Sequence, residues 1–365
     1  MSSQQKTPGY QPKKLLKLPK EMPSNIIIKS ENSEPVNVPY QMNQTEQIAV
    51  ASTAVQHQDR SKKAFAPASE LVNRINIDFK KLQSFKDVDC SKWQILYLAK
   101  LKACHRIADF SDSKKDQELK EQKKECLIEI IDVLDEQEAA DHIIKERVLE
   151  ATMQMISANL FRTFTNKNNK KASSVDPDED EPHLEEAWPH LQLVYELLLK
   201  FILTTHLRND VIVKHISNNF INSFLELFDS EDPRERDYLK TILHRIYGKF
   251  MAIRPTIKHQ IMNVLLKVVY TYNIETHNGL TELLEILSSI TSGLTTPLKQ
   301  EHQTFFKKVL IPLHKVKTLA TYNTQLQLCV KNYLEKSNQL HVPLICGLLK
   351  FWPITCPSKE VIFIQ

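Results

Sequence analysis

Glycine is scarce in this 365-residue chain, which has only 5 glycines against 17 prolines. Glycine supplies the positive φ angles that phosphate-cradling loops and tight hairpins require. None of the 5 glycines is followed by aspartate or asparagine, so the Gly-Asp and Gly-Asn-His elements of metallophosphatases are also missing. The sequence therefore argues against nucleotide sites built on Gly-rich loops and against metallophosphatase chemistry.

Paired cysteines and long apolar runs are missing as well. The 6 cysteines are scattered and form no CxxC pair, which predicts reduced thiols rather than a disulfide framework. No apolar run approaches the roughly 18 residues that a membrane span needs. The first residues also lack the charged start and apolar middle of a signal peptide. We therefore expect a soluble intracellular chain, located in the cytoplasm or the nucleus.

The common catalytic signatures do not occur. The sequence contains no P-loop, GxSxG, HExxH or Cys-x5-Arg motif, so we expect no enzyme activity, no cofactor and no metal. One cluster has the residue types of a divalent-metal site: His183, Glu185, Glu186 and His190. Pro182 and Pro189 interrupt the spacing that would place these side chains on one helix face. Solvated loop residues are the favoured interpretation, and a metal-dependent hydrolase site is the alternative.

The charge of the chain is concentrated at its start. The net charge is +4, and residues 1–66 hold 9 basic and 5 acidic residues, whereas residues 67–365 hold 39 of each. A neutral body does not favour nucleic-acid binding, which needs a concentrated basic surface. Residues 1–66 are rich in proline and polar residues and predict a disordered basic tail. This tail is either a plain linker or a segment that contacts membranes, nucleic acid or an import receptor.

From about Pro67 onward, apolar residues recur three and four positions apart, which is the pattern of one helix face. The clearest stripes lie at residues 188–202, 216–228, 238–250 and 257–268. Further stripes lie at residues 283–290, 306–313 and 344–351. Because the residue before a proline resists helical geometry, Arg254-Pro255 predicts a break between two of these helices. Strand-type alternation is nearly absent.

The number of helices favours a repeat array. Helices of about 12 to 18 residues that recur in pairs predict an all-α, HEAT/armadillo-like α-solenoid over residues 67–365, with a closed bundle as the alternative. A solenoid should end in a polar cap, but this chain ends with Val361-Ile-Phe-Ile-Gln365. We interpret this apolar end as an array truncated at its C-terminus, or as a surface that a partner covers.

Two polar segments interrupt the helical pattern. Residues 176–186 contain seven acids in eleven positions, and residues 229–237 combine five acids with two arginines. Both segments could be ordinary solvated loops whose carboxylates cap helices. A proline in each makes them stiffer than random tails, so they could also dock on basic protein surfaces.

Cationic and aromatic residues lie beside an apolar stripe at residues 244–249, and Arg254 follows. Two helices later come a second group of residues: Glu285, Ile286, Ile290, Lys299 and His302. In a solenoid, equivalent helices of successive repeats line one wall, so the two groups could flank a groove. Such a groove would suit a peptide with aliphatic anchors and acidic or phosphorylated side chains. The alternative is a set of core residues with basic tips that reach solvent.

Four segments carry a resemblance to a known family: AWPHLQLVYE at 187–196, LELFDSEDPRERD at 225–237, LHRIYGKF at 243–250 and LIPLHKVK at 310–317. They closely resemble the B-prime family of regulatory subunits of protein phosphatase type 2A, and the likeness extends from about Leu82 to Phe363. The resemblance implies a non-catalytic, HEAT-like solenoid. Such a subunit joins the phosphatase scaffold and catalytic subunits and selects substrates. An adaptor with unrelated protein partners remains the alternative.

The resemblance also implies a use for the groove, because the family captures partners that carry a short Leu-x-x-Ile-x-Glu motif. By this likeness, His244, Arg245 and Tyr247 would line the pocket and meet the glutamate and backbone of the motif. Ile286 and Ile290 would receive its aliphatic anchors.

The remaining roles follow from the same resemblance. Glu285 would accept backbone hydrogen bonds, and Arg254, Lys299 and His302 would attract acidic or phosphorylated flanks. The residues implied to contact the core enzyme are Asp178, Glu179, Asp180, Glu181, Glu231, Asp232, Arg234, Glu235 and Asp237.

Overall fold

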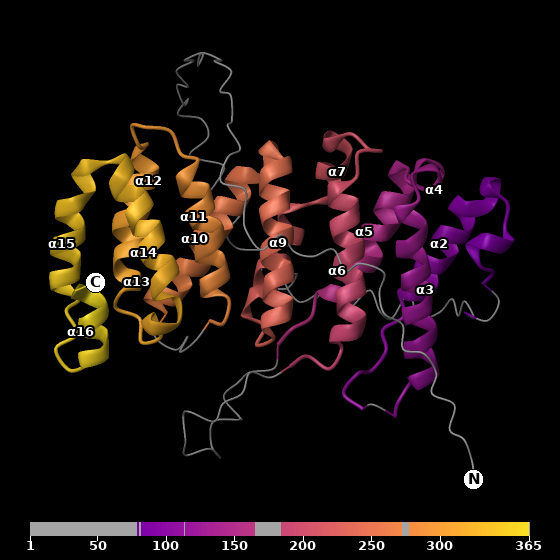
Figure 1. Cartoon of the computed structure of the whole chain (residues 1–365), viewed down its shortest axis with the longest axis horizontal. Helices are drawn as coiled ribbons and strands as arrows, with labels where there is room; N and C mark the ends of the chain where they lie inside the picture. Colours follow the sequence, from indigo (N-terminus) through magenta and orange to yellow (C-terminus); the bar gives the residue numbers. More distant parts are fainter. Residues whose placement is uncertain (1–78, 80–81, 113, 165–183, 272–276, 365) are drawn as a thin grey trace, which may run out of the picture. The chain divides into compact units, whose positions relative to one another are not determined.

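A computed structural model describes residues 79, 82–112, 114–164, 184–271 and 277–364 of the chain (Figure 1). These residues all belong to one compact unit, Asp59–Gln365. The predicted tail at residues 1–66 and the acidic residues Asp178 to Glu181 lie outside the described residues. Within the described part, all regular secondary structure is helical.

Fifteen α-helices are described, and several are joined by single helical turns. The α-helices are α2 (Trp93–Cys104), α3 (Gln117–Asp135), α4 (Gln137–Ile143), α5 (Glu146–Leu160), α6 (Trp188–Leu203), α7 (Asn209–His215), α8 (Asn218–Glu226), α9 (Pro233–Lys249), α10 (Arg254–Tyr270), α11 (Leu280–Ser292), α12 (Gln300–Phe305), α13 (Ile311–Leu313), α14 (Leu319–Lys336), α15 (His341–Lys350) and α16 (Pro357–Ile364). The 3-10 turns are Phe85–Asp87, Cys90–Lys92, Leu227–Asp229, Met251–Ile253 and Asn338–Leu340, and a π-helix spans Phe306–Leu310.

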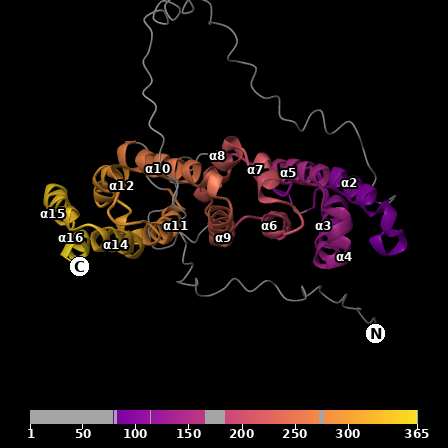
Figure 2. The same ribbon diagram turned by 90° about the horizontal axis from the view of Figure 1, so that it is seen from above.

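The helices pack in two rows, and each helix contacts the helices next to it in its row (Figure 2). One row contains α2, α5, α7, α8, α10 and α13, and the other contains α3, α6, α9, α11 and α14. Contacts between α2 and α3 and between α5 and α6 join the rows. Such stacking buries each apolar face only against adjacent helices. The prediction of an all-α, HEAT-like solenoid is therefore confirmed for the described residues.

The predicted apolar stripes form the core between the rows. The stripe on α6 is fully covered, with Trp188 7% exposed and Leu198 0% exposed. On α8 and the turn after it, the Phe220 and Phe224 rings stack at a centroid distance of 6.0 Å, and the Phe228 ring meets Phe224 edge to face at 6.4 Å. Burial of such large side chains contributes about 1.5–3 kcal/mol each. No helix among the described residues is long and apolar enough to cross a bilayer.

The break between α9 and α10 occurs where proline predicts it. Pro255 occupies the first turn of α10, where its missing N–H costs nothing because that donor would be unsatisfied anyway. Arg254, which the sequence places at this break, is the first residue of α10. The residues between the two helices form a short 3-10 turn, Met251–Ile253.

Lysines tie successive helices of one row together at the same edge. Lys249, at the end of α9, donates to the carbonyl oxygens of Ile202 and Thr204 at the end of α6, at 2.7 and 2.6 Å. Lys336, at the end of α14, donates to the Leu294 carbonyl just beyond α11, at 2.7 Å. The last carbonyls of a helix lack intrahelical partners. These lysines satisfy them with charge-assisted bonds from the next helix of the row.

The stripe at residues 344–351 is only partly covered by the described residues. Leu344, Leu348 and Phe351 are half-buried, although they belong to the predicted apolar face of α15. On the other side of the same helix, Val342 and Leu349 are 69% and 65% exposed. The helix nevertheless lies very close to α13, because a Cβ atom on Gly347 would meet the Ile311 side chain at 2.2 Å.

Gly279 permits another close approach, and replacing it with alanine is expected to destabilise the protein. An added Cβ would lie 2.4 Å from the Phe228 carbonyl oxygen and 2.7 Å from the Phe228 Cβ. Backbone atoms cannot move aside cheaply, so Gly279→Ala should lower the free energy of unfolding by about 1–3 kcal/mol. Chemical unfolding measures this loss. Gly248→Ala is the matched control, because no atom lies within 4 Å of its added Cβ.

Candidate functional site

The start of α9 is fixed by the buried carboxylate of Asp232. Its side chain caps the helix by accepting from the Arg234 amide at 2.9 Å, and it also accepts from the Glu185 amide at 3.0 Å. The Arg234 guanidinium closes an ion pair with the same carboxylate at 2.6 Å. Burial alone would raise the pKa of Asp232, but these hydrogen bonds lower it overall. Asp232 therefore carries a charge that serves the fold.

Glu235 lies one turn further along α9 and is completely buried. Its two carboxylate oxygens accept from the Arg162 guanidinium at 2.9 and 2.7 Å, and one of them also accepts from the Tyr195 hydroxyl at 2.7 Å. Arg162 also pairs with Glu185 at 3.0 Å. The implied contact of Asp232 and Glu235 with a core enzyme therefore needs correction, because both side chains are buried and bonded inside this chain.

The other implied contact residues of this segment reach the surface. Arg234 is exposed, and Glu231 and Asp237 are half-buried. Asp237 shares Lys240 with Glu285, at 3.0 and 2.9 Å. The acidic residues Asp178 to Glu181 lie outside the described residues.

The two predicted peptide-binding groups meet where α9 packs against α11. Polar pairs follow this contact from one end to the other. Lys240 on α9 binds Glu285 on α11 at 2.9 Å, and His244 Nε2 lies 3.1 Å from Ser289 Oγ. We call the set of His244, Arg245, Tyr247, Glu285 and Ser289 the α9–α11 surface. The prediction that the two groups are neighbours holds for residues 244–249 and for Glu285, Ile286 and Ile290, whose helices are in contact.

The basic and imidazole groups of this surface differ in charge and exposure. Burial first, and then the neighbouring Arg245 cation, lower the pKa of His244. His244 is therefore neutral at pH 7, and its second ring nitrogen can donate or accept a hydrogen bond, depending on the tautomer. Arg245 is exposed to solvent. Its guanidinium is the planar, permanently charged group that binds a carboxylate with two hydrogen bonds.

Tyr247 and Arg254 form one unit at the end of α9. The Arg254 guanidinium lies 5.1 Å from the centre of the Tyr247 ring and donates to the Tyr247 carbonyl at 2.8 Å. A second bond runs from Arg254 to the Gly248 carbonyl at 3.0 Å. Arg254 thus holds the end of α9 as well as supplying a positive charge.

The two isoleucines that were predicted to bind the aliphatic residues of the motif are more buried than the prediction requires. Ile286 is 1% exposed and Ile290 is 6% exposed, because both side chains face the core formed with the neighbouring helices. Spacing on a helix shows which residues share a face, but it does not show whether that face is covered. Ile290 alone keeps a small exposed edge, and the expectation of an open apolar floor made by both isoleucines is corrected.

Lys299 and His302 lie at the start of α12. Lys299 precedes the helix and is exposed, whereas His302 is half-buried and contacts Glu301 at 3.4 Å. Burial is the main cause that lowers the pKa of His302, and the cations Lys258 and Lys299 add to it. Among the described residues, no hydrogen bond or ion pair joins Lys299 or His302 to α9 or α11.

The metal-site alternative finds no support in the described part of the chain, where no cluster of histidine, cysteine and carboxylate side chains could hold an ion. Glu185 is engaged by Arg162. His190 is buried against Asn159 and stacks on Phe110 at 5.4 Å, and burial lowers its pKa to about 3. His183 lies outside the described residues.

Sequence reasoning missed three residues that shape the site. Lys240 lies four positions before His244 on the same helix face, so helical spacing could have revealed it. Ser289 is the partner of His244, and Arg162 is the partner of Glu235. The pairing of Arg162 with Glu235 spans 73 positions and has no local signal.

Comparisons with known proteins show sequence similarity over the described helical part of the chain. Residues 82–365 match the family model described as "Protein phosphatase 2A regulatory B subunit (B56 family)". The chain belongs to the B56 family. It is 45% identical over 291 residues to the human "Serine/threonine-protein phosphatase 2A 56 kDa regulatory subunit delta isoform", covering 80% of this chain and 48% of that protein. It is 46% identical over 283 residues to the human alpha isoform, covering 78% of this chain and 57% of that protein.

The likeness extends to plants. The beta isoform of the 57 kDa B' regulatory subunit of serine/threonine protein phosphatase 2A from Arabidopsis thaliana is 45% identical over 285 residues, covering 78% of this chain and 56% of that protein. The B56-family chain therefore spans about half the length of the curated relatives that it matches. The sequence segments at residues 187–317 indicated membership in a family of phosphatase regulatory subunits. The family match confirms it.

Proposed function

We propose that this chain acts as a regulatory subunit of protein phosphatase 2A and recruits substrates through Leu-x-x-Ile-x-Glu motifs held on the α9–α11 surface. The chain would join the scaffold and catalytic subunits and would supply no catalysis itself. The names of its relatives support the regulatory part of this proposal. The observation that carries the motif-binding part is the direct contact of α9 with α11.

The groups of this surface fit such a peptide. Arg245 offers an exposed guanidinium to the motif's glutamate, and neutral His244 offers a hydrogen bond to its backbone. Glu285 is half-buried and shares Lys240, which leaves acceptor capacity for a backbone N–H. The aliphatic residues of the motif would rest against the half-buried Tyr247 ring. Lys299 and His302 would attract acidic flanks from further along the array.

Arg245→Ala is expected to weaken binding of a Leu-x-x-Ile-x-Glu peptide by about 1.5–3 kcal/mol, because it removes a charge-assisted hydrogen bond. The unmodified chain should bind the free peptide in the micromolar range, about −8 kcal/mol, since ordering a flexible segment opposes the contacts. Titration calorimetry measures both values.

The matched control is Arg208→Ala. Arg208 is also exposed, with 80% of its side chain accessible, and within the described residues it pairs with Asp210 two positions away. This variant should keep the full peptide affinity. An Arg245→Ala variant that binds as tightly as the Arg208→Ala variant would remove Arg245 from the site.

Assembly with the phosphatase needs a separate test. The whole chain, expressed with a tag in cells, should co-purify with the scaffold and catalytic subunits if it acts as proposed. Capture of Leu-x-x-Ile-x-Glu proteins without either of these subunits would favour an adaptor. Metal-dependent hydrolysis by the purified chain would favour an enzyme instead.

A further inference from the structure

The part of the chain beyond α11 is strongly basic, although the helical body as a whole is neutral. Residues 293–365 contain 9 lysines against 3 glutamates, and they contain neither arginine nor aspartate. Residues 67–292 carry the opposite charge, with 30 basic and 36 acidic residues. The last helices therefore bear a positive charge that the average over the body conceals.

Four lysines lie around Tyr270 at the end of α10, whose side chain is 59% exposed. The Tyr270 hydroxyl donates to the Lys308 carbonyl at 2.9 Å, and the Lys315 ammonium lies 5.0 Å from the centre of the Tyr270 ring. The Lys359 ammonium donates to the Lys315 carbonyl at 3.0 Å. Lys267 is exposed three positions before Tyr270, hence on the same face of α10. We call these five residues the Tyr270 patch.

Packing between separate helical segments fixes the Tyr270 patch. Helix α10 packs against both the π-helix and α13. Within the π-helix, Phe306, Val309 and Leu310 are buried, and the two lysines between them, Lys307 and Lys308, are exposed. Figure 1 shows α10, α13 and α16 in the orange and yellow part of the array. The patch is therefore built by the fold and does not come from a single run of lysines.

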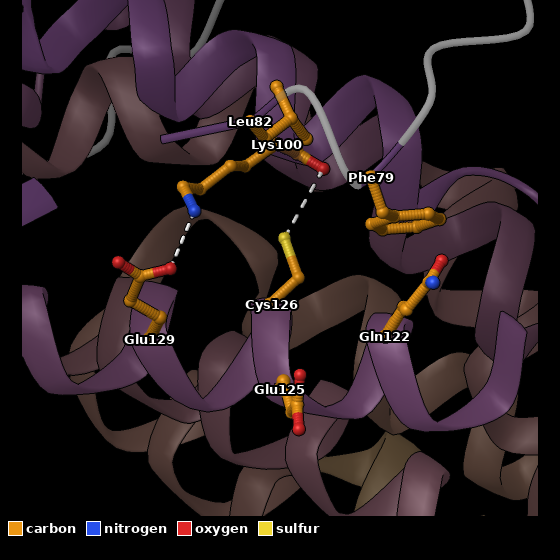
Figure 3. Close-up of a pocket in the computed structure, with 7 residues that line it drawn as sticks. All are labelled: Phe79, Leu82, Lys100, Gln122, Glu125, Cys126 and Glu129. Carbon is orange, nitrogen blue, oxygen red and sulfur yellow. Dashed lines mark hydrogen bonds and ion pairs between the residues drawn. The ribbon is translucent and has the colours of Figure 1, made fainter. Parts of the chain in front are cut away.

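Lysines elsewhere in the array have carboxylate partners inside the chain. Lys100 is 4% exposed and pairs with Glu129 at 2.5 Å beside a cavity of about 350 Å³, as Figure 3 shows. Lys240 has two partners, Asp237 and Glu285. Among the described residues, in contrast, no carboxylate forms an ion pair with any of the four lysines of the Tyr270 patch. Their positive charges are therefore available to an anion from outside the chain.

The side chains of the patch indicate the kind of anion. Arginine binds a phosphate or a carboxylate through a rigid fork of two hydrogen bonds, whereas lysine offers a mobile point charge. Lysines alone therefore suit carboxylates spread along a flexible segment. Because the Tyr270 hydroxyl is engaged and Lys315 covers one face of the ring, Tyr270 is poorly placed to stack on a nucleic-acid base or to enter a bilayer.

We propose that the Tyr270 patch docks an acidic segment of a partner protein, whose aspartate and glutamate side chains pair with the four lysines. Exposed ion pairs are individually weak and are screened by salt, so several must act together. The patch is centred on the row that contains α10 and α13, whereas α9 and α11 belong to the other row. The proposal therefore does not rest on the motif-binding role of the α9–α11 surface.

Fluorescence anisotropy of the whole chain with a labelled acidic peptide tests the proposal. The probe is a peptide of about ten residues in which glutamate alternates with serine, and the dissociation constant should lie at about 10–100 μM in low salt. Raising the salt from about 50 to about 300 mM should weaken binding at least about fivefold. The same peptide with glutamine in place of glutamate should not bind, and equal binding of the two peptides would overturn the proposal.

A pair of double variants with the same change in net charge locates the site. Lys308→Glu with Lys315→Glu should weaken the acidic peptide at least about tenfold. Lys102→Glu with Lys214→Glu is the matched control, because both lysines are exposed and lie on α2 and α7. This control should weaken the peptide by no more than about threefold. Equal losses in the two double variants would show that only net charge matters, and would overturn the proposal.

Two further measurements separate this patch from other partners and sites. Lys308→Glu with Lys315→Glu should leave the affinity for a Leu-x-x-Ile-x-Glu peptide unchanged, and Arg245→Ala should leave the affinity for the acidic peptide unchanged. The opposite pattern would move acidic-peptide binding to the α9–α11 surface and overturn the proposal. Binding of phosphatidylserine vesicles or of a single-stranded oligonucleotide that falls in the double variant, while peptide binding does not, would also overturn it.

A single variant guards against a folding defect in the double variant. Lys267→Glu changes one exposed side chain on α10, and it should weaken the acidic peptide about threefold with an unchanged circular dichroism spectrum. Lys102→Glu alone is its control and should bind the peptide like the unmodified chain. Equal affinities of the Lys267→Glu and Lys102→Glu proteins would contradict the placement of Lys267 in the patch.

Discussion

Replacing Arg162 with alanine is expected to lower the free energy of unfolding by about 3–5 kcal/mol, because it leaves a buried carboxylate without its counter-charge. Glu235 is 0% exposed, and both of its carboxylate oxygens accept hydrogen bonds from the Arg162 guanidinium. Among the described residues, the Tyr195 hydroxyl would remain as its one hydrogen-bond partner. Chemical unfolding followed by circular dichroism measures the loss.

The control for this prediction is again Arg208→Ala. Its pair with Asp210 is exposed on both sides, at 80% and 58%, so this variant should cost less than about 1 kcal/mol. A double variant, Arg162→Ala with Glu235→Leu, should recover part of the loss because no buried charge is left alone. Equal losses for Arg162→Ala and Arg208→Ala would contradict the central role of this ion pair.

Lys123 is expected to make the stability of the protein rise with pH between about 8 and 10.5. Lys123 is 1% exposed, and its ammonium group donates to two neutral acceptors of the described chain, the Arg106 carbonyl and the Asn159 side chain, both at 2.6 Å. Burial lowers its pKa from 10.5 to about 8. Between these values the unfolded chain binds the proton and the folded chain does not, so raising the pH favours folding.

The size of this change in stability follows from the lowered pKa of Lys123. Across this window, the unmodified protein should gain about 3 kcal/mol relative to a Lys123→Met variant, which has no group to titrate at this position. Below pH 8 both states of the unmodified chain hold the proton, so the difference between the two proteins should stay constant. Stability profiles that run parallel from pH 7 to 10.5 would refute the prediction. Lys102→Met is the control on the same helix pair, because Lys102 is exposed.

The helical array could be predicted from the sequence because its determinants are local. Apolar stripes such as residues 188–202 and 216–228 set which faces are buried, and Pro255 sets a helix start. These patterns need only residues within one or two turns. The coverage of α15 could not be predicted, because a stripe shows which face is apolar and not what packs against it.

Some features of the candidate site could likewise be predicted from the sequence, and others could not. The meeting of residues 244–249 with residues 285–290 follows from the repeat pattern, which places equivalent helices side by side. The burial of Ile286 and the inward direction of Glu235 depend on long-range packing that no spacing rule contains. Acidic residues in a polar segment suggest an exposed loop, yet Arg162, 73 positions away, draws Glu235 into the core.

The lysines at the ends of α9 and α14 have a mechanical consequence. Each holds the terminal carbonyls of the preceding helix in its row, so the row is fastened along one edge by charge-assisted bonds. Spreading the helices apart at that edge must first break these bonds. The α6–α9 and α11–α14 pairs should therefore resist being pulled apart at this edge.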